Sequence, residues 1–272
     1  KALVLVDNEE ELKSVLGTVT DIGAEHILLG NGSNFLVSDE GYPGIMIKLG
    51  GNFNHIYIDE EDETLVKVGG AKYLSGTSSF VTDRGLAGME FASGIPGSIG
   101  GALFMNAGAY GGEMKDIVQA VRLIAPNGSR IINRSNEEMQ FSYRHSILQE
   151  DGYIVLETTL KLDKDDPKAI AERVLELQRK RNSKQPVNLP SAGSTFKRPI
   201  SGYAAALIDE AGLKGYRIGG AQVSEKHAGF IVNLGDATAE DVLRLMRHVK
   251  KVVFEKTEII LEPEVRLINC SL

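Results

Sequence analysis

Short apolar runs separated by turn residues dominate the first half of the chain, and this pattern is typical of β-strands. Runs of strand length are ALVLV (2–6), ILLG (27–30), IMIKL (45–49), IYI (56–58), TLVKV (64–68), QAVRLIAP (119–126) and YIVLETTLKL (153–162). The turn Pro126-Asn127-Gly128 separates one run from RIIN, which predicts a hairpin. ILLG leads directly into glycines, so we expect a buried strand that ends at a glycine loop.

Apolar residues at helical spacing are more frequent in the second half. Helices are predicted at 7–16, at 71–84, after Pro167, at 201–212 and after Thr238. Asp7 with Glu10 forms a capping box for the first helix, and Thr238 with Asp241 forms one for the last. Ser201 is the expected cap of the helix at 201–212. Strands are expected at 229–234 (GFIVNL) and 259–268 (IILEPEVRLI). The mixture of predicted strands and helices indicates an α+β fold. Three acids, a lysine and a proline at 163–167 indicate a domain boundary, so we expect domains at 1–162 and 163–272.

Composition and charge restrict the class of protein. The 272 residues are 42% hydrophobic and 25% charged, and no apolar run approaches the roughly 20 residues of a membrane helix. The net charge of −7 disfavours a general nucleic-acid binder. A single cysteine, Cys270, excludes an internal disulfide framework and a cysteine zinc site, and favours the cytoplasm. Because the chain opens on a strand already under way, we expect an N-terminal part to be missing.

Positive charge is concentrated in one stretch despite the acidic balance. From Arg179 to Arg198 there are six basic residues and no acidic ones. The basic C-terminal end of a helix accounts for residues 179–181, because cations there complement the helix dipole. Lys184, Lys197 and Arg198 remain open between a structural role and the binding of an anionic ligand.

Two loops dense in glycine follow predicted strands. The first runs from Gly30 to Asn34 and the second from Gly94 to Gly101, with NAGAYGG (106–112) close behind. Glycines let successive backbone N–H groups converge on one point, where they bind phosphate oxygens. The first loop has Phe35 where the Rossmann fingerprint needs its third glycine, and neither loop has the Gly-Lys-Ser/Thr of a P-loop. Two such loops in one α+β half predict a site for a dinucleotide diphosphate.

Six motifs spread over the chain carry a family resemblance: LGNGSNFLV, EFASGIPGSIGGALFMNAGAYGGE, FSYRHSIL, SAGSTFKRP, LKGYRIGGAQVSEKHAGFIVN and LEPEVRLI. Their order resembles that of the UDP-N-acetylenolpyruvoylglucosamine reductase family from about Ile27 to Ile268. The resemblance implies an FAD-binding α+β fold of the vanillyl-alcohol-oxidase/PCMH type at 1–162 and a C-terminal α+β substrate-binding domain at 163–272, whose last strand could return to the first domain. It also implies the compact class of the family, without a tyrosine-bearing loop, and a missing upstream segment that normally helps to hold FAD.

The resemblance further implies non-covalent FAD, NADPH as co-substrate and the enolpyruvyl ether of UDP-N-acetylglucosamine as substrate. Implied FAD contacts are Gly30, Asn31, Gly32, Ser33, Asn34, Gly94, Ile95, Pro96, Gly97, Ser98, Gly100, Gly101 and Ala107. Implied substrate contacts are Lys184, Arg198, Gln222 and His227. Arg198 stands where some relatives have asparagine, and a structural role for His227 is equally open.

Three residues would carry the chemistry. No histidine lies near Ser194 in the sequence, so Ser194 lacks the base that a serine nucleophile needs. The resemblance instead makes Ser194 the donor of a proton to the carbanion that forms when a hydride from FAD reaches the vinyl carbon. Arg144 would hold the substrate carboxylate, and Glu264 would assist only if it is protonated or hydrogen-bonded to the substrate, so we expect a raised pKa for Glu264.

Two other functions remain open from the sequence. Another FAD oxidoreductase of the same fold would share the glycine loops, and the lack of histidine in those loops favours non-covalent FAD. A nucleotide-sugar binding module without catalysis would account for the loops and the basic stretch, but not for Arg144, Ser194 and Glu264 together. Neither nucleic acid nor a membrane is expected as a partner, and the protein is expected to be a monomer or a weak oligomer. The other histidines do not have the spacing of metal ligands, so no metal site is expected.

Overall fold

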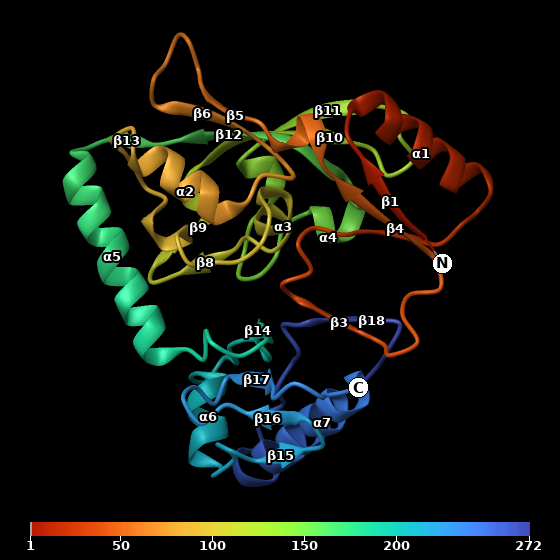
Figure 1. Cartoon of the computed structure of the whole chain (residues 1–272), viewed down its shortest axis with the longest axis vertical. Helices are drawn as coiled ribbons and strands as arrows, with labels where there is room; N and C mark the ends of the chain where they lie inside the picture. Colours follow the sequence, from red (N-terminus) through yellow and green to blue (C-terminus); the bar gives the residue numbers. More distant parts are fainter. Residues whose placement is uncertain (1) are drawn as a thin grey trace. The chain divides into compact units, whose positions relative to one another are not determined.

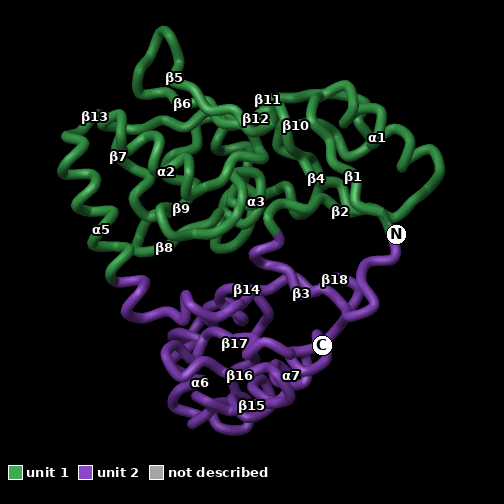
Figure 2. Tube along the Cα trace, viewed as in Figure 1, with its two compact units in different colours: residues 1–31, 44–179 green, residues 32–43, 180–272 purple. Residues whose placement is uncertain are grey.

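The chain divides into two compact units (Figure 2), and the computed structural model describes residues 2–272. Unit 1 comprises residues 2–31 and 44–179, and unit 2 comprises residues 32–43 and 180–272. The expected boundary between residues 162 and 163 differs from this division. Residues 163–179 belong to unit 1, where strand β13 (Asp163–Lys164) pairs with β7 (Leu86–Ala87) before helix α5 (Pro167–Lys184) begins.

The segment 32–43 belongs to unit 2 because of one strand pair. Strand β3 (Phe35–Val37) pairs in parallel with β18 (Arg266–Ile268), near the C-terminus. The last strand therefore does return to a strand from the first part of the sequence, but that strand lies in unit 2 and not in unit 1. Of the strand expected at 259–268, only the end forms β18.

Unit 1 begins with a three-stranded parallel sheet, in the order β1 (Ala2–Val6), β4 (Ile45–Leu49) and β2 (His26–Leu28). Helix α1 (Glu9–Asp21) follows β1. Its N-cap is Asn8, whose side chain accepts a hydrogen bond from the Glu11 N–H at 3.0 Å. The expected capping box of Asp7 and Glu10 is therefore wrong by one residue, and the helix extends beyond its expected end. The core on this side contains Val6, Leu12, Leu16, Ile47, Ile124 and Ile154.

A five-stranded antiparallel sheet forms the larger part of unit 1, in the order β11-β10-β12-β6-β5. Its strands are β5 (Ile56–Ile58), β6 (Leu65–Gly69), β10 (Val118–Ile124), β11 (Ile131–Ser135) and β12 (Ile154–Lys161). The hairpin expected at residues 126–128 joins β10 to β11 and is confirmed. Helices α2 (Leu74–Thr82) and α3 (Ile99–Phe104) lie on the same side of this sheet (Figure 1) and bury apolar side chains against it. The helix expected at 71–84 is thus present but shorter.

Short elements complete unit 1. They are β8 (Gly108–Ala109), β9 (Gly112–Glu113), α4 (Leu148–Asp151) and the 3-10 helices η1 (Gly51–Asn54), η2 (Glu90–Ala92), η3 (Met114–Asp116) and η4 (Glu137–Met139). Most of these short elements lie between α3 and β12, in the stretch of chain that also contributes β10 and β11 to the sheet. This stretch contains both NAGAYGG and the segment FSYRHS.

Unit 2 is built on a four-stranded antiparallel sheet, in the order β14 (Ser191–Ser194), β17 (Phe230–Asn233), β16 (Ala221–Val223) and β15 (Arg217–Ile218). Helix α7 (Ala239–Thr257) begins with the expected capping box of Thr238 and Asp241, which is confirmed. Helix α6 (Ala204–Glu210) starts later than expected, with Tyr203 as its N-cap in place of Ser201. Across residues 2–272, none of the helices is both long enough and apolar enough to cross a membrane.

Candidate active site

The two glycine loops approach each other closely. A Cβ atom added to Gly30 would lie 2.8 Å from Ser98 Oγ, a separation that real Cβ atoms do not show. Ser98 is buried and is the N-cap of α3, where its Oγ accepts a hydrogen bond from the Gly101 N–H at 3.3 Å. Gly97, with φ 129°, turns the chain into this cap through a conformation that favours glycine. The structure therefore brings together Gly30 and Ser98, two of the residues expected to contact FAD.

A glycine pair at the end of β6 supports the second loop. The Gly100 N–H donates to Gly70 O at 2.8 Å, and the Ile99 N–H donates to Lys72 O at 2.8 Å. A Cβ atom on Gly70 would lie only 2.2 Å from Val155 O, so this position requires glycine. The N–H of Gly100, an expected FAD contact, is thus bonded within the protein. Sequence reasoning missed Gly70, although a glycine pair directly after the run TLVKV was a visible signal.

Asn31 carries a buried amide nitrogen, Nδ2, without a hydrogen-bond partner among the described residues. An unsatisfied buried donor costs about 1–3 kcal/mol, so the Asn31 amide requires a partner such as a ligand or a water molecule. Asn31 directly follows Gly30, whose lack of a side chain permits the close approach to Ser98. A donor beside two converging glycine loops fits the diphosphate of FAD, and Asn31 is one of the residues expected to hold it. Ala107, another expected contact, has its own backbone N–H bonded to Ala102 O at 2.8 Å.

The end of the first glycine loop reaches the C-terminal segment within unit 2. Asn34 Nδ2 donates to the backbone oxygen of Glu264 at 3.2 Å. Asn34 O accepts a hydrogen bond from the Arg266 N–H at 2.9 Å, next to the β3–β18 pair. Asn34, expected at FAD, is therefore held to Glu264, expected in catalysis, by a hydrogen bond from its side chain to the Glu264 backbone.

Ser194 and Glu264 lie on neighbouring extended segments of unit 2. The Glu264 N–H donates to Thr195 O at 2.9 Å, and Phe196 forms an isolated antiparallel bridge with Pro263. Thr195 is buried, and its Oγ1 accepts a hydrogen bond from the Ile231 N–H of β17 at 3.1 Å. The segment 194–197 is thus fixed on one side by β17 and on the other by residues 262–264. Ser194 itself is half-buried at the end of β14.

Arg144 is carried by a tight turn in unit 1. Ser142 and His145 exchange two backbone hydrogen bonds of 3.1 Å, so Tyr143 and Arg144 form the tip of the turn. Arg144 has φ 54°, a left-handed conformation that costs a non-glycine residue about 1–3 kcal/mol and persists only where the surrounding structure imposes it. Its Nη2 donates to Gly108 O at 3.3 Å. The turn therefore directs the guanidinium at the NAGAYGG segment, while Ser194 and Glu264 belong to the other unit.

The charges of two lysines of unit 2 act on His227. Burial lowers the pKa of His227, and the charges of Lys214 and Lys184 lower it further. His227 Nδ1 accepts a hydrogen bond from the Gly229 N–H at 3.2 Å, so the proton of the neutral ring is on Nε2. The structure brings together the expected residues Lys184 and His227 and adds Lys214, which sequence reasoning missed within the motif LKGYR. Lys184 is also the last residue of α5, so it contributes to the basic end of that helix.

Gln222 and Arg198 make other contacts. Gln222 Nε2 donates to Gly215 O at 3.1 Å, which ties β16 to the turn before β15. The guanidinium of Arg198 lies 4.3 Å from the ring centroid of Tyr203. In these positions Gln222 has a structural hydrogen bond, and Arg198 is an exposed cation at the surface of unit 2.

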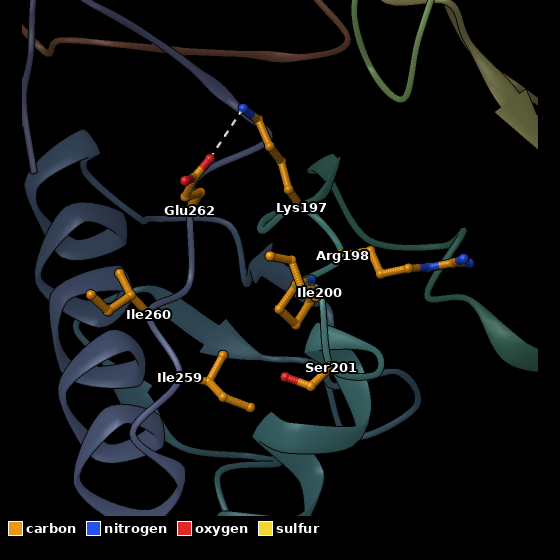
Figure 3. Close-up of a pocket in the computed structure, with 8 residues that line it drawn as sticks. Lys197, Arg198, Ile200, Ser201, Ile259, Ile260 and Glu262 are labelled. Carbon is orange, nitrogen blue, oxygen red and sulfur yellow. Dashed lines mark hydrogen bonds and ion pairs between the residues drawn. The ribbon is translucent and has the colours of Figure 1, made fainter.

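A surface pocket of about 390 Å³ lies beside Arg198 (Figure 3). It is lined by Lys197, Arg198, Pro199, Ile200, Ser201, Ile259, Ile260 and Glu262. Lys197 Nζ lies 3.4 Å from a carboxylate oxygen of Glu262, and Arg198 extends away from this ion pair. Ser194 and Glu264 do not line this pocket, whereas Arg198, an expected substrate contact, does.

Comparisons with known proteins agree with the two halves of this arrangement. Residues 1–132 match the model of an FAD binding domain, and residues 185–268 match the C-terminal domain of UDP-N-acetylenolpyruvoylglucosamine reductase. The enzymes named UDP-N-acetylenolpyruvoylglucosamine reductase from Lachnoclostridium phytofermentans and Clostridioides difficile are 45% and 47% identical over 98% of this chain and 86% of theirs.

A solved structure extends the likeness to the fold. The crystal structure of UDP-N-acetylenolpyruvylglucosamine reductase from Thermus caldophilus has a TM-score of 0.83 and 39% identity, and the match covers 97% of this chain and 91% of that one. The predicted family and the predicted FAD-binding fold are both confirmed. The chain therefore belongs to the UDP-N-acetylenolpyruvoylglucosamine reductase family and is an FAD-containing oxidoreductase.

Proposed function

We propose that the protein reduces the enolpyruvyl ether of UDP-N-acetylglucosamine to UDP-N-acetylmuramate, with NADPH as the source of electrons, in peptidoglycan synthesis. The observation that carries this proposal is the pairing of the Ser194 and Glu264 segments through Thr195 O, at 2.9 Å from the Glu264 N–H. It makes the backbones of the segments that carry Ser194 and Glu264 neighbours, and the pairs β14–β17 and β3–β18 hold these segments in place. A proton donor and a group that stabilises an enolate need such fixed neighbours.

Ser194 supplies the proton that completes the reduction. Bound FAD would supply the redox chemistry, as the carrier of a hydride from NADPH to the vinyl methylene carbon of the substrate. The adjacent carbon then carries the electron pair as an enolate conjugated with the substrate carboxylate, which is a strong base. A serine hydroxyl is acidic enough to protonate such a carbon if it is positioned correctly, and the half-buried Ser194 needs no histidine beside it.

Arg144 and Glu264 stabilise the negative charge that develops during this step. A planar guanidinium can donate two parallel hydrogen bonds to the substrate carboxylate. Glu264 assists in its protonated form by donating a hydrogen bond to the enolate oxygen, for which a raised pKa is required. Its backbone is held at both ends, through Thr195 O and Asn34 Nδ2, so its side chain starts from a fixed position.

Lys184, Lys214 and His227 form the cationic cluster that we assign to the diphosphate of the nucleotide. Lys184 supplies a positive charge, Lys214 Nζ is already paired with Asp209 Oδ2 at 2.6 Å, and the Nε2–H of the neutral His227 adds one directed donor. The proposal does not depend on the other two expected contacts. The Gln222 side chain is already bonded to Gly215 O, and the Arg198 guanidinium lies over the ring of Tyr203.

The two half-reactions can be followed separately under anaerobic conditions. NADPH should bleach the yellow flavin of the wild-type protein, and the enolpyruvyl nucleotide should restore the colour. In Ser194→Ala, bleaching should be unchanged while recolouring slows by at least about a hundredfold, the lower range for general acid catalysis. Thr195→Ser, which keeps a hydroxyl at the buried neighbouring position, is the matched control and should behave as the wild type.

Equal slowing of both half-reactions in Ser194→Ala would contradict the role of the serine as a proton donor. A protein that binds FAD and is reduced by NADPH but is never reoxidised by the enolpyruvyl nucleotide would indicate an oxidoreductase of the same fold with another substrate. A protein that stays colourless with added FAD would indicate a binding module without catalysis.

A further inference from the structure

The turn that carries Arg144 is clamped to the end of helix α3 and the residues directly after it. Ser146, which has no solvent-exposed surface, donates from its Oγ to Phe104 O at 3.0 Å. Asn106, also without exposed surface, donates from Nδ2 to Ser142 O at 3.0 Å, while its Oδ1 accepts a hydrogen bond from the Lys115 N–H at 2.9 Å. Both contacts end on backbone groups, so neither side chain can reach a ligand.

Gln149 adds a bond to Arg144 itself. Its Nε2 donates to Arg144 O at 3.0 Å and to Phe104 O at 2.8 Å, so a single amide group joins the two segments. Gln149 lies in the short helix α4, one turn after the tip, and is exposed to solvent. The hydrogen bond from Gln149 acts directly on Arg144, the residue with the strained φ of 54°. It holds the backbone carbonyl of Arg144 itself.

We propose that Gln149 is a positioning residue for Arg144: its amide fixes the backbone of Arg144 against Phe104 and so sets the direction of the guanidinium. This inference rests on the proposed function, in which Arg144 holds the substrate carboxylate. The buried bonds of Asn106 and Ser146 keep the base of the turn in place, and Gln149 fixes its tip. Without the amide, the Arg144 carbonyl loses the bond that holds it, and the left-handed conformation depends only on the remaining bonds of the turn.

The effect should be confined to one half-reaction. Gln149 is exposed and contacts neither glycine loop, so its removal should leave FAD affinity and the bleaching of the flavin by NADPH unchanged. In Gln149→Ala we expect recolouring by the enolpyruvyl nucleotide to slow about tenfold, less than the roughly hundredfold loss that a 1 Å misplacement causes. In Gln149→Glu the defect should be at least as large, because a carboxylate cannot donate to the two carbonyl oxygens.

The controls separate positioning from general loosening of the unit. Gln119→Ala removes an exposed glutamine from β10, in the same unit but outside the clamp, and should leave both half-reactions unchanged. In the Arg144→Ala background, Gln149→Ala should have no further effect on recolouring, because a residue that acts through Arg144 has nothing left to position.

The outcomes also separate this inference from the function on which it rests. If Arg144→Ala leaves recolouring intact, the proposed role of Arg144 fails. If Arg144→Ala abolishes recolouring while Gln149→Ala is indistinguishable from the wild type, the function stands and the positioning role is overturned. The positioning role would also be overturned if the two substitutions slowed recolouring additively in the double variant. A loss of FAD affinity in Gln149→Ala as large as its loss of recolouring rate would overturn it as well.

Discussion

The contact between Gly30 and Ser98 predicts a measurable cost for one added methyl group. In Gly30→Ala the new Cβ would lie 2.8 Å from Ser98 Oγ, so the serine has to rotate. Rotation breaks the hydrogen bond from the Gly101 N–H, which caps α3. The φ angle of Gly30 lies outside the left-handed region, so the cost comes from this contact and not from the backbone.

The magnitude follows from the lost cap. Replacing a serine N-cap costs typically about 1 kcal/mol, and we expect the free energy of unfolding of the FAD-free protein to fall by about this amount in Gly30→Ala. If bound FAD requires the original position of the Ser98 side chain, binding has to restore that position against the new Cβ atom, so the dissociation constant of FAD should rise. Urea unfolding measures the first quantity and quenching of flavin fluorescence measures the second.

Two variants test the physical reason. Gly17→Ala places a methyl group in the middle of α1, where no atom lies within 4 Å, and should stabilise the protein by about 0.5–1 kcal/mol. In a Ser98→Ala background, where the cap is already lost and the oxygen is gone, Gly30→Ala should cost almost nothing further. An equal cost of Gly30→Ala in both backgrounds would show that the methyl group meets something other than Ser98 Oγ.

Two other features of unit 2 lead to expected outcomes. Because burial and the charges of Lys214 and Lys184 lower the pKa of His227, the folded state binds a proton less readily than the unfolded state, and wild-type stability should fall as the pH drops below about 6.5. In His227→Gln the stability, measured by urea unfolding, should fall less as the pH drops. If the wild type and the variant lost stability equally, the lowered pKa of His227 would be contradicted. Thr238→Ala loses the hydrogen bond from the Asp241 N–H at 3.1 Å and should lower the free energy of unfolding by about 1 kcal/mol; an unchanged midpoint would contradict the capping role.

Local pattern predicted much of the fold because it reports what each segment buries. The runs at 45–49 and 56–58 form strands with the expected bounds, and the capping box of Thr238 begins a helix as expected. The error at the first helix has a local cause as well. Asp7 and Asn8 are both good caps, and the acid three residues further on is present for each, so the pattern alone does not choose between them.

The division into units could not be predicted from pattern because it depends on one long-range pair. Residues 32–43 look like a loop after a glycine turn, and only the parallel pairing of β3 with β18 assigns them to unit 2. The contacts of Gly70 and Gln149 are of the same kind. Gly70 needs to be glycine because Val155 O passes it, and Gln149 matters because its amide reaches two carbonyl oxygens more than three residues away in sequence.

The position of Asn34 links two predictions that the sequence treats as independent. The glycine loop and the segment LEPEVRLI lie at opposite ends of the chain, yet Asn34 donates to Glu264 O and accepts from the Arg266 N–H. Residues 31–34 are consecutive, so a ligand that orders Asn31 also restricts Asn34, and through it the backbone of Glu264. If FAD contacts Asn31 as we propose, its binding should limit the motion of the Glu264 segment.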